Sequence, residues 1–261
     1  MMNCIDIGKI VRNRFGNFPQ FLEPLLRRFI RQDFINAFLS QGYEGTEFCT
    51  ECLKYLNVTL DVEGLENLPD EPCTIVCTHP LGGVDAVAML SVAGQKYSGN
   101  IKLIANDFLM NLDGLAPFLV PVNKIGTQSS DISDRIDAMF ASDCQTVVFP
   151  AGKVARKRGG VITEQDWKPT FLRKSLKYGR DVIPVHFYGR NTWRFYLADW
   201  ISNLFHSKFP IAMALLPDEL YRSQGKTYRI VIGEPVPAFA FDGSKSIKAW
   251  TEWLRDKACS L

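Results

Sequence analysis

The sequence predicts an α/β fold with a mostly parallel central sheet, helices on both faces of that sheet and an N-terminal amphipathic helical segment. Three observations predict this class. Short apolar runs alternate with longer segments of helical periodicity along most of the chain. Of the 261 residues, 46% are hydrophobic and 22% are charged, which is typical of a folded domain with a sizeable core. The first fifty residues follow a helical apolar pattern only.

The N-terminal part of the chain has aromatic and basic character. Apolar side chains recur there at helical spacing, and they are Phe21, Leu22, Leu25, Leu26, Phe29, Ile30, Phe34, Ile35, Phe38 and Leu39. Arg27, Arg28 and Arg31 fall on the other side of the same helical pattern. Such a helix can pack on a domain or lie in a membrane interface, and the pattern leaves both open. We therefore expect residues 1–58 to form an amphipathic, membrane-associating segment and residues 59–261 to form the α/β domain.

The elements of the predicted domain follow from the position of the apolar runs. Strands are expected at residues 73–78, 102–105, 119–122, 146–149, 181–187 and 227–232, and helices at residues 85–94, 132–141, 167–178 and 246–257. Strands that alternate with helices indicate a mostly parallel sheet. In such sheets the loops that follow the strands carry the functional groups.

Several classes of protein are excluded or disfavoured by the sequence. No apolar run reaches the roughly 18 residues of a membrane-spanning helix. The first ten residues contain Asp6 and Lys9 and have no apolar core, so a secretory signal is not expected. The net charge of +2 is lower than that of most nucleic-acid-binding proteins, so binding to nucleic acid is not expected. The glycine-rich phosphate loops and the Gly-x-Ser-x-Gly motif of serine hydrolases are absent from the sequence.

The seven cysteines, an odd number, suggest free thiols in a reducing compartment. Cys49 with Cys52, and Cys73 with Cys77, have spacings that could supply four thiolates to zinc. The first pair falls on a predicted helix, however, and the second pair flanks a predicted strand. We therefore favour buried thiols and expect no metal.

The first chemical motif is Thr78-His79-Pro80-Leu81-Gly82-Gly83-Val84-Asp85, between a strand and a helix. His79 follows the carboxyl end of the strand, and its imidazole can accept a proton near neutral pH. Asp85 is close enough in sequence to bind one ring nitrogen, which leaves the other nitrogen free to take a proton from a substrate hydroxyl. A structural histidine, with Asp85 capping the helix, is the alternative.

Three further segments follow predicted strands and carry cations. Residues 149–160 hold Lys153, Arg156 and Arg158 between glycines, a pattern that could cradle a phosphate or carboxylate or form a solvated loop. Lys124 ends the segment of residues 120–124, and Arg190 follows the strand of residues 182–187. We expect these five cations to contribute to substrate binding. His186, within the last of these strands, is expected to be structural.

The order of the four segments resembles the glycerolipid acyltransferase family, which acylates lysophosphatidic acid and related lipids. Its His-x4-Asp motif is matched by His79 to Asp85, its substrate-binding motif by residues 119–124, its Phe-Pro-Glu-Gly-Thr-Arg motif by residues 149–158 and its Val-Pro-Val strand by residues 182–187. The resemblance covers about residues 60–235. The details look most like a bacterial branch described as hemolysin-like or as aminolipid O-acyltransferases.

The sequence departs from the family pattern at three places. Five residues separate His79 from Asp85 where the family has four, and we expect the Gly-Gly loop to absorb the extra residue. The family's Glu in its third motif is Ala151 here, and its Thr-Arg is replaced by Lys153 and Val154. A lysine that often helps to hold the phosphate in the family corresponds to Asn106. A carboxylate acceptor, such as an N-acyl amino acid, therefore becomes an alternative to a phosphate.

The resemblance implies direct acyl transfer without a cofactor. His79 would deprotonate the acceptor hydroxyl, and the hydroxyl would attack a thioester of acyl carrier protein or coenzyme A. The amides of Gly82 and Gly83 are candidates for the oxyanion hole. The acceptor would be a lysolipid such as 1-acylglycerol-3-phosphate, or else an N-acyl amino acid of the glycine or ornithine type. A non-catalytic lipid-binding protein and a lipid hydrolase remain as further alternatives.

The charge distribution agrees with a peripheral protein at the cytoplasmic face of a membrane. Residues 9–31 carry a net charge of +5 and residues 153–180 a net charge of +7, which leaves −10 for the remainder. We interpret the first basic zone as suited to an anionic membrane surface and the second as suited to an anionic acceptor.

Overall fold

The computed structural model describes residues 5–6, 8, 12, 21, 23–105, 109, 112–121, 129–204 and 211–261. Its main sheet has seven strands in the order β1-β9-β8-β2-β5-β3-β4. The strands are β1 (Thr59–Glu63), β2 (Thr74–Cys77), β3 (Ile101–Ala105), β4 (Leu119–Pro121), β5 (Gln145–Val148), β8 (Val182–Phe187) and β9 (Thr227–Ile232). Five neighbouring strands, β8 to β4, are parallel, and β9 with β1 runs in the opposite direction. The predicted α/β class with a mostly parallel sheet is confirmed.

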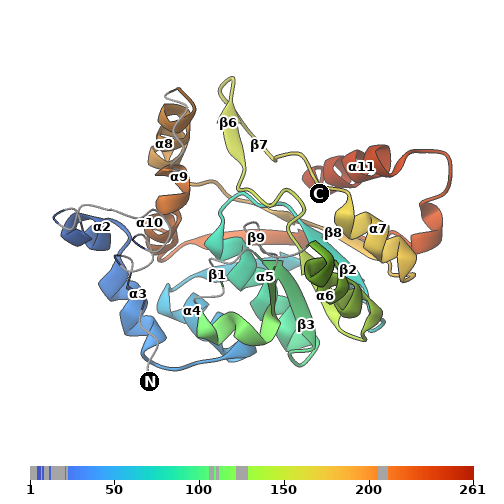
Figure 1. The fold of residues 1–261 in the computed structure, drawn as a ribbon, viewed down its shortest axis with the longest axis horizontal. Coiled ribbons are helices and arrows are strands. Elements are labelled where there is room, and N and C mark those ends of the chain that lie inside the picture. The colour runs from blue at the N-terminus through green and yellow to red at the C-terminus, as the bar shows by residue number, and fades with distance from the viewer. Residues whose placement is uncertain are drawn as a thin grey trace.

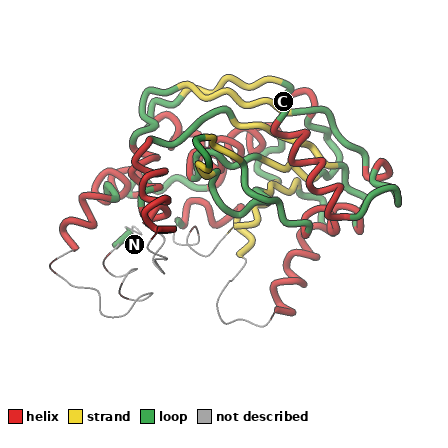
Figure 2. The backbone as a smooth tube through the Cα atoms, turned by 90° about the horizontal axis from the view of Figure 1, so that it is seen from above, coloured by secondary structure: helices red, strands yellow, loops and turns green. Residues whose placement is uncertain are grey.

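Helices cover both faces of the sheet because successive strand residues point to opposite sides. Ile75 of β2 belongs to a core cluster that includes side chains of α4 (Gly45–Tyr55) and α5 (Gly83–Lys96). Its neighbour Val76 belongs to a second cluster, formed with α7 (Thr170–Lys177) and α11 (Ile247–Cys259). A third cluster forms under α6 (Ser129–Ala141). Figures 1 and 2 show these helices gathered around the strands.

The described part of the N-terminal segment is helical, as predicted. Its helices α3 (Gln32–Leu39) and α4 pack against the domain, whereas α2 (Glu23–Phe29) is exposed. Phe38 of α3 and four side chains of α4 are buried in the same core cluster as the strands. The expected domain boundary at residue 58 therefore does not coincide with a break in the packing. In contrast, α2 has no buried residue, and Leu25 is 66% exposed. No described helix is both long and apolar enough to span a bilayer.

Most predicted strands and helices agree with the structure within a few residues. Helix α7 begins only at Thr170, although we expected a helix from residue 167, because Pro169 disfavours helical backbone in the residue before it. Several elements were not predicted: β1, β6 (Arg156–Arg158), β7 (Val161–Thr163), α8 (Trp193–Leu204), α9 (Ile211–Ala214), α10 (Leu216–Tyr221) and the 3-10 turns η2 (Leu65–Asn67), η4 (Asp113–Phe118) and η5 (Ala238–Ala240). In Figure 1, α8 rises beside the hairpin of β6 and β7.

The four cysteines weighed as zinc ligands are buried free thiols in the structure. Burial raises the pKa of Cys52 and of Cys73 to about 12, and it also raises the pKa of Cys49 and Cys77. Because zinc binds thiolates, thiols held protonated by burial are poor ligands. Within the described ranges no group of three His, Cys, Asp or Glu side chains is arranged to hold a metal ion.

Candidate active site

The central parallel strands bring three of the predicted segments to one edge of the sheet. Strand β2 lies between β8 and β5 and is parallel to both. The carboxyl ends of parallel strands meet at one edge, so His79 after β2, Lys153 after β5 and Arg190 after β8 all follow that edge. Lys124, the candidate that follows β4, lies outside the described residues.

His79 and Asp85 form a hydrogen-bonded dyad. The His79 Nδ1 atom lies 2.9 Å from Asp85 Oδ2. The Asp85 side chain is fully buried, whereas the His79 side chain is 17% exposed. A buried carboxylate on Nδ1 holds the imidazole in the tautomer whose Nε2 is a proton acceptor. Among the described residues nothing hydrogen bonds to Nε2, so this atom is available to a substrate.

The loop between His79 and Asp85 bends around the Asp85 carboxylate. Oδ2 of Asp85 also accepts hydrogen bonds from the main-chain N–H groups of Leu81 and Gly82, each at 2.9 Å. Gly82 has φ +94° and ψ −105°, a backbone conformation that other L-residues rarely adopt. A Cβ atom on Gly82 would lie 2.9 Å from the Leu216 side chain. The contact between His79 and Asp85 therefore forms across five intervening residues, with a glycine in this conformation at position 82.

The main chain of His79 is fixed on both sides by the segment that follows β5. Its N–H donates to Glu164 Oε2 at 3.0 Å, and its carbonyl accepts from the Ala155 N–H at 2.8 Å. The other Glu164 oxygen accepts from the Trp167 indole N–H at 3.1 Å. Burial raises the pKa of the Glu164 carboxyl above its usual value. The Phe149 ring lies 4.6 Å from the imidazole, centre to centre, and completes the enclosure of His79.

The segment after β8 supports the same loop through the side chain of Asn191. The buried Asn191 amide donates to the Pro80 carbonyl at 3.3 Å. Gly189 approaches Leu81 so closely that a Cβ atom would lie 3.0 Å from that side chain. Arg190 is exposed. Neither Asn191 nor Glu164 belongs to a sequence motif, so no signal in the sequence pointed to either.

The arginines of the predicted anion cradle are both paired with one acid of the protein, Arg156 in the interior and Arg158 at the surface. Arg156 is buried, and its Nε lies 2.9 Å from Asp199 Oδ1 on α8, while its guanidinium lies 4.9 Å from the Phe195 ring centre. Arg158 reaches the other Asp199 oxygen at 2.7 Å. The two cations expected to bind an acceptor therefore share one internal carboxylate. Lys153, in contrast, is exposed.

Comparisons with known proteins place nearly the whole chain in a family. A family model described as acyltransferase matches residues 11–261. The chain belongs to the acyltransferase family. It is 41% identical to the lyso-glycine lipid O-acyltransferase of Phocaeicola vulgatus, over 98% of this chain and 95% of that protein. It is 42% identical to the lyso-glycine lipid O-acyltransferase of Bacteroides thetaiotaomicron, over 97% of this chain and 95% of that protein.

The fold of this acyltransferase is also similar to that of a solved structure. The crystal structure of the 1-acyl-sn-glycerophosphate acyltransferase PlsC from Thermotoga maritima superposes with a TM-score of 0.52 at 16% identity. The match covers 99% of this chain and 89% of that chain. The expected membership of an acyltransferase family, and the expectation of an enzyme, are thus confirmed.

The two glycines considered for the oxyanion hole of the acyltransferase differ in what their amides do. The Gly82 N–H is directed at Asp85, so it supports the dyad. Gly83 begins helix α5, and the first N–H groups of a helix have no acceptor within it. The Gly82 amide is thus already bound within the protein, whereas Gly83 lies at the first position of the helix.

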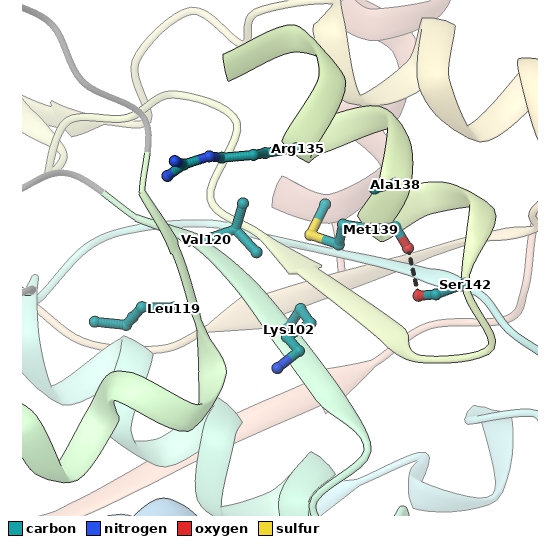
Figure 3. A pocket seen from close by; sticks show the side chains of 7 residues that line it. All are labelled: Lys102, Leu119, Val120, Arg135, Ala138, Met139 and Ser142. Carbon is teal, nitrogen blue, oxygen red and sulfur yellow. Dashed lines mark hydrogen bonds between the residues drawn. The ribbon is translucent and has the colours of Figure 1, made fainter. Parts of the chain in front are cut away.

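A shallow pocket of about 390 Å³ lies at the β4 edge of the acyltransferase. Figure 3 shows its lining, which consists of Lys102, Leu119, Val120, Arg135, Ala138, Met139 and Ser142. Leu119 and Val120 begin the segment expected to bind substrate. None of His79, Asp85 or the cations discussed above lines this pocket, so it is separate from the dyad.

Proposed function

We propose that this acyltransferase moves a fatty acyl chain from a thioester to the hydroxyl of a lysolipid, with His79 as general base and Asp85 as the residue that orients it. The observation that carries the proposal is the 2.9 Å contact of Asp85 with Nδ1, on an imidazole whose Nε2 stays available. General-base assistance of this kind is worth about 10²–10⁴ in rate. The residues present can perform the transfer without a metal or a redox cofactor.

In the proposed reaction His79 Nε2 takes the proton of the acceptor hydroxyl as the oxygen attacks the thioester carbonyl. A carbon–oxygen bond forms, and a tetrahedral intermediate carries the negative charge on the former carbonyl oxygen. The Gly83 amide at the start of α5 is our candidate donor to that oxygen. The carbon–sulfur bond then breaks, and the imidazolium returns the proton to the leaving thiolate. Asp85 stabilises the imidazolium between these steps.

For the acceptor we favour a lysolipid with a carboxylate head group of the N-acyl glycine type, and 1-acylglycerol-3-phosphate is the second candidate. Two observations support this choice. Both relatives described above, which match nearly the whole chain, are named for a lyso-glycine lipid. In addition, Arg156 and Arg158 are paired with Asp199, which reduces the positive charge available to a doubly charged phosphate. Lys153 is the exposed cation that we assign to the carboxylate.

The donor and the location follow from the same reaction. We propose a thioester of acyl carrier protein or coenzyme A as co-substrate, and peripheral attachment at the cytoplasmic face of the membrane where the acceptor resides. Helix α2 supports attachment because Leu25 is exposed while Arg27 and Arg28 are also on the surface. Phe21, just before α2, is 80% exposed. An apolar face flanked by arginines suits an anionic bilayer surface.

Acyl transfer by the purified protein tests the proposal. The protein is supplied with an acyl thioester and either a lyso-glycine lipid or a lysophosphatidate, and the diacyl product and free fatty acid are both measured. We expect transfer to the lyso-glycine lipid and a loss of at least about 100-fold in His79→Ala, the lower end of the range of general-base effects. His186→Gln is the matched control, because His186 lies on β8 and contacts Tyr188.

Four outcomes would overturn parts of the proposal. Full activity of the His79→Ala variant would show that His79 is not the general base. Release of free fatty acid at full rate without an acceptor would indicate a hydrolase. Lipid binding without any turnover by the parent protein would indicate the non-catalytic alternative, and faster transfer to lysophosphatidate would reverse the choice of acceptor.

A further inference from the structure

Helix α8 is apolar on two opposite faces, although only one of them is packed inside the protein. On the inner face, Phe195 and Ala198 are buried in a cluster with Val154, Ala212 and Leu215. On the outer face, Trp193 is 71% exposed, Leu197 43%, Trp200 58% and Leu204 54%. This is the densest group of exposed large apolar side chains among the described residues.

The four outer side chains form one continuous stripe. Their spacing of four, three and four residues places them along a single face of an α-helix. A helix with apolar side chains on two opposite faces normally buries both of them. The described part of the chain covers the inner face of α8 only, so the outer face is left for an external partner.

The surroundings of the stripe are positively charged. Next to Trp193, Arg194 contacts the buried Asp218 at 3.1 Å. Arg31 and Arg222 contact the same carboxylate, at 2.9 and 2.6 Å. Three guanidinium groups thus share the Asp218 carboxylate, and the neighbouring Glu219 carboxylate accepts hydrogen bonds from Thr192, so these groups together carry a net charge of about +1. On the inner side of α8, Arg156 and Arg158 likewise share the single carboxylate of Asp199.

Helix α2 lies at the same end of the protein as α8 (Figure 1). Phe29, the last residue of α2, packs against the same cluster as the inner face of α8. Arg31 then joins the chain after α2 to α10 through Asp218. Figure 1 shows α2 and α8 at the same end of the molecule. The exposed Leu25 and the stripe therefore belong to one end of the protein.

We infer that the outer face of α8 is a second membrane contact, which lies in the interface of an anionic bilayer. Tryptophan suits this position because its indole is apolar with one polar N–H, and arginines beside it attract anionic head groups. A protein partner is a poorer fit, because the four side chains expose on the order of 500 Å², less than the roughly 800 Å² per partner of a standard interface. The inference extends the attachment proposed above and does not depend on the reaction.

Sedimentation with vesicles tests this inference on the full chain. The double variant Trp193→Ser/Trp200→Ser is compared with Phe239→Ser, which removes an 87% exposed side chain from η5. With vesicles of phosphatidylcholine and phosphatidylglycerol in equal parts, we expect the double variant to partition at least tenfold less than the parent, since about tenfold is expected for each buried indole. The control should partition like the parent. Brominated acyl chains should quench tryptophan fluorescence in the parent more than in the double variant.

Turnover of a detergent-dispersed acceptor is measured in parallel and should be unchanged in the double variant. An inactive parent that still binds vesicles through α8 would overturn the proposed reaction and leave this inference intact. Three results would overturn the inference: equal partition of the parent and the double variant, a parent dimer that the double variant dissociates in the absence of lipid, or loss of binding to acyl carrier protein with vesicle binding retained. A Leu25→Ser variant measures the contribution of α2 to vesicle binding separately.

Discussion

The main-chain N–H of His79 donates a hydrogen bond to the side chain of Glu164 across 3.0 Å, although the two residues are 85 positions apart. Within the described part of the chain, the hydrogen bond between Glu164 and His79 runs to the main chain of His79 and not to its imidazole ring. Glu164 fixes the backbone from which the ring projects, and it is tied in turn to Trp167. The glutamate of the family's third motif is replaced by Ala151 in this sequence. Glu164, thirteen positions later, nevertheless places a largely buried carboxyl beside His79.

Glu164 is predicted to be a positioning residue for His79. Glu164→Ala leaves two buried N–H donors without an acceptor and lets the loop shift, so kcat/KM should fall by about ten- to a hundredfold. Glu164→Gln keeps an acceptor for the His79 N–H and should recover most of this loss. Asp166→Asn, at a fully exposed side chain nearby, is the control. Equal activity of the Ala and Gln variants would refute the positioning role.

Glu164 should also make stability depend on pH. Burial raises the pKa of its carboxyl in the folded protein above the unfolded value, so folding favours the neutral form. The cost of the buried charge is therefore absent below the unfolded pKa, about 4.3, and appears as the pH rises through the folded pKa. Glu164→Gln is neutral throughout. Its free energy of unfolding in urea, relative to that of the parent, should increase from about pH 4 to about pH 8; a constant difference would contradict this.

Asp85→Asn tests the orientation of the imidazole. An amide nitrogen at the Oδ2 position would favour the wrong tautomer and would face the Leu81 and Gly82 N–H donors. An amide nitrogen at the Oδ1 position would be a buried donor where Oδ1 has no partner. We expect kcat to fall by about 10²–10⁴ while partition to vesicles stays unchanged. A loss of less than about tenfold would mean that the carboxylate serves mainly to cap α5.

The local parts of the site could be predicted from the sequence. His79 and Asp85 are six positions apart, between a strand and a helix whose apolar periodicities are clear, so their contact follows from one turn of the chain. The carboxyl ends of β2, β5 and β8 meet because parallel strands share a direction. These inferences need only local patterns and the geometry of a parallel sheet.

The contacts that shape the rest of the site join distant segments, and no local pattern encodes them. Asn191 reaches Pro80 across 111 positions, and Asp199 reaches Arg158 across 41. Helix α8 was not predicted because its apolar residues lie on two faces and give no single helical stripe. Ion pairs between distant residues are likewise not encoded in a local pattern. In the sequence residues 153–180 form a basic zone, although several of these cations are paired within the fold.

Gly82→Ala is predicted to disable the site through a clash. The added Cβ atom would lie 2.9 Å from Leu216 and 3.3 Å from Val154, in a backbone conformation that alanine rarely adopts. Gly160→Ala is the matched control, since it has a similar φ of +87° but no atom within 4 Å of the new Cβ. Both variants should lose roughly 1–3 kcal/mol of stability, but only Gly82→Ala should lose acyl transfer. Equal activity of the two would show that the loop tolerates displacement.

The last prediction separates the structural role of Arg156 from the acceptor-binding role expected from the sequence. Asp199→Ala leaves the buried Arg156 guanidinium without its carboxylate, so the free energy of unfolding should fall by about 3–5 kcal/mol. Adding Arg156→Met removes that charge while keeping an apolar side chain against Phe195, and should restore much of the loss.

Kinetics with the lyso-glycine lipid then distinguish the two roles. Because Arg156 already has an internal partner, the Asp199→Ala/Arg156→Met protein should keep the KM of the parent for the acceptor within about threefold, whereas Lys153→Met should raise it about tenfold by removing an exposed charge from the carboxylate. Unfolding in urea and steady-state kinetics on the same samples measure both effects. A large increase in KM for the double variant, with no change for Lys153→Met, would return Arg156 to the acceptor site and leave Lys153 without a role in binding.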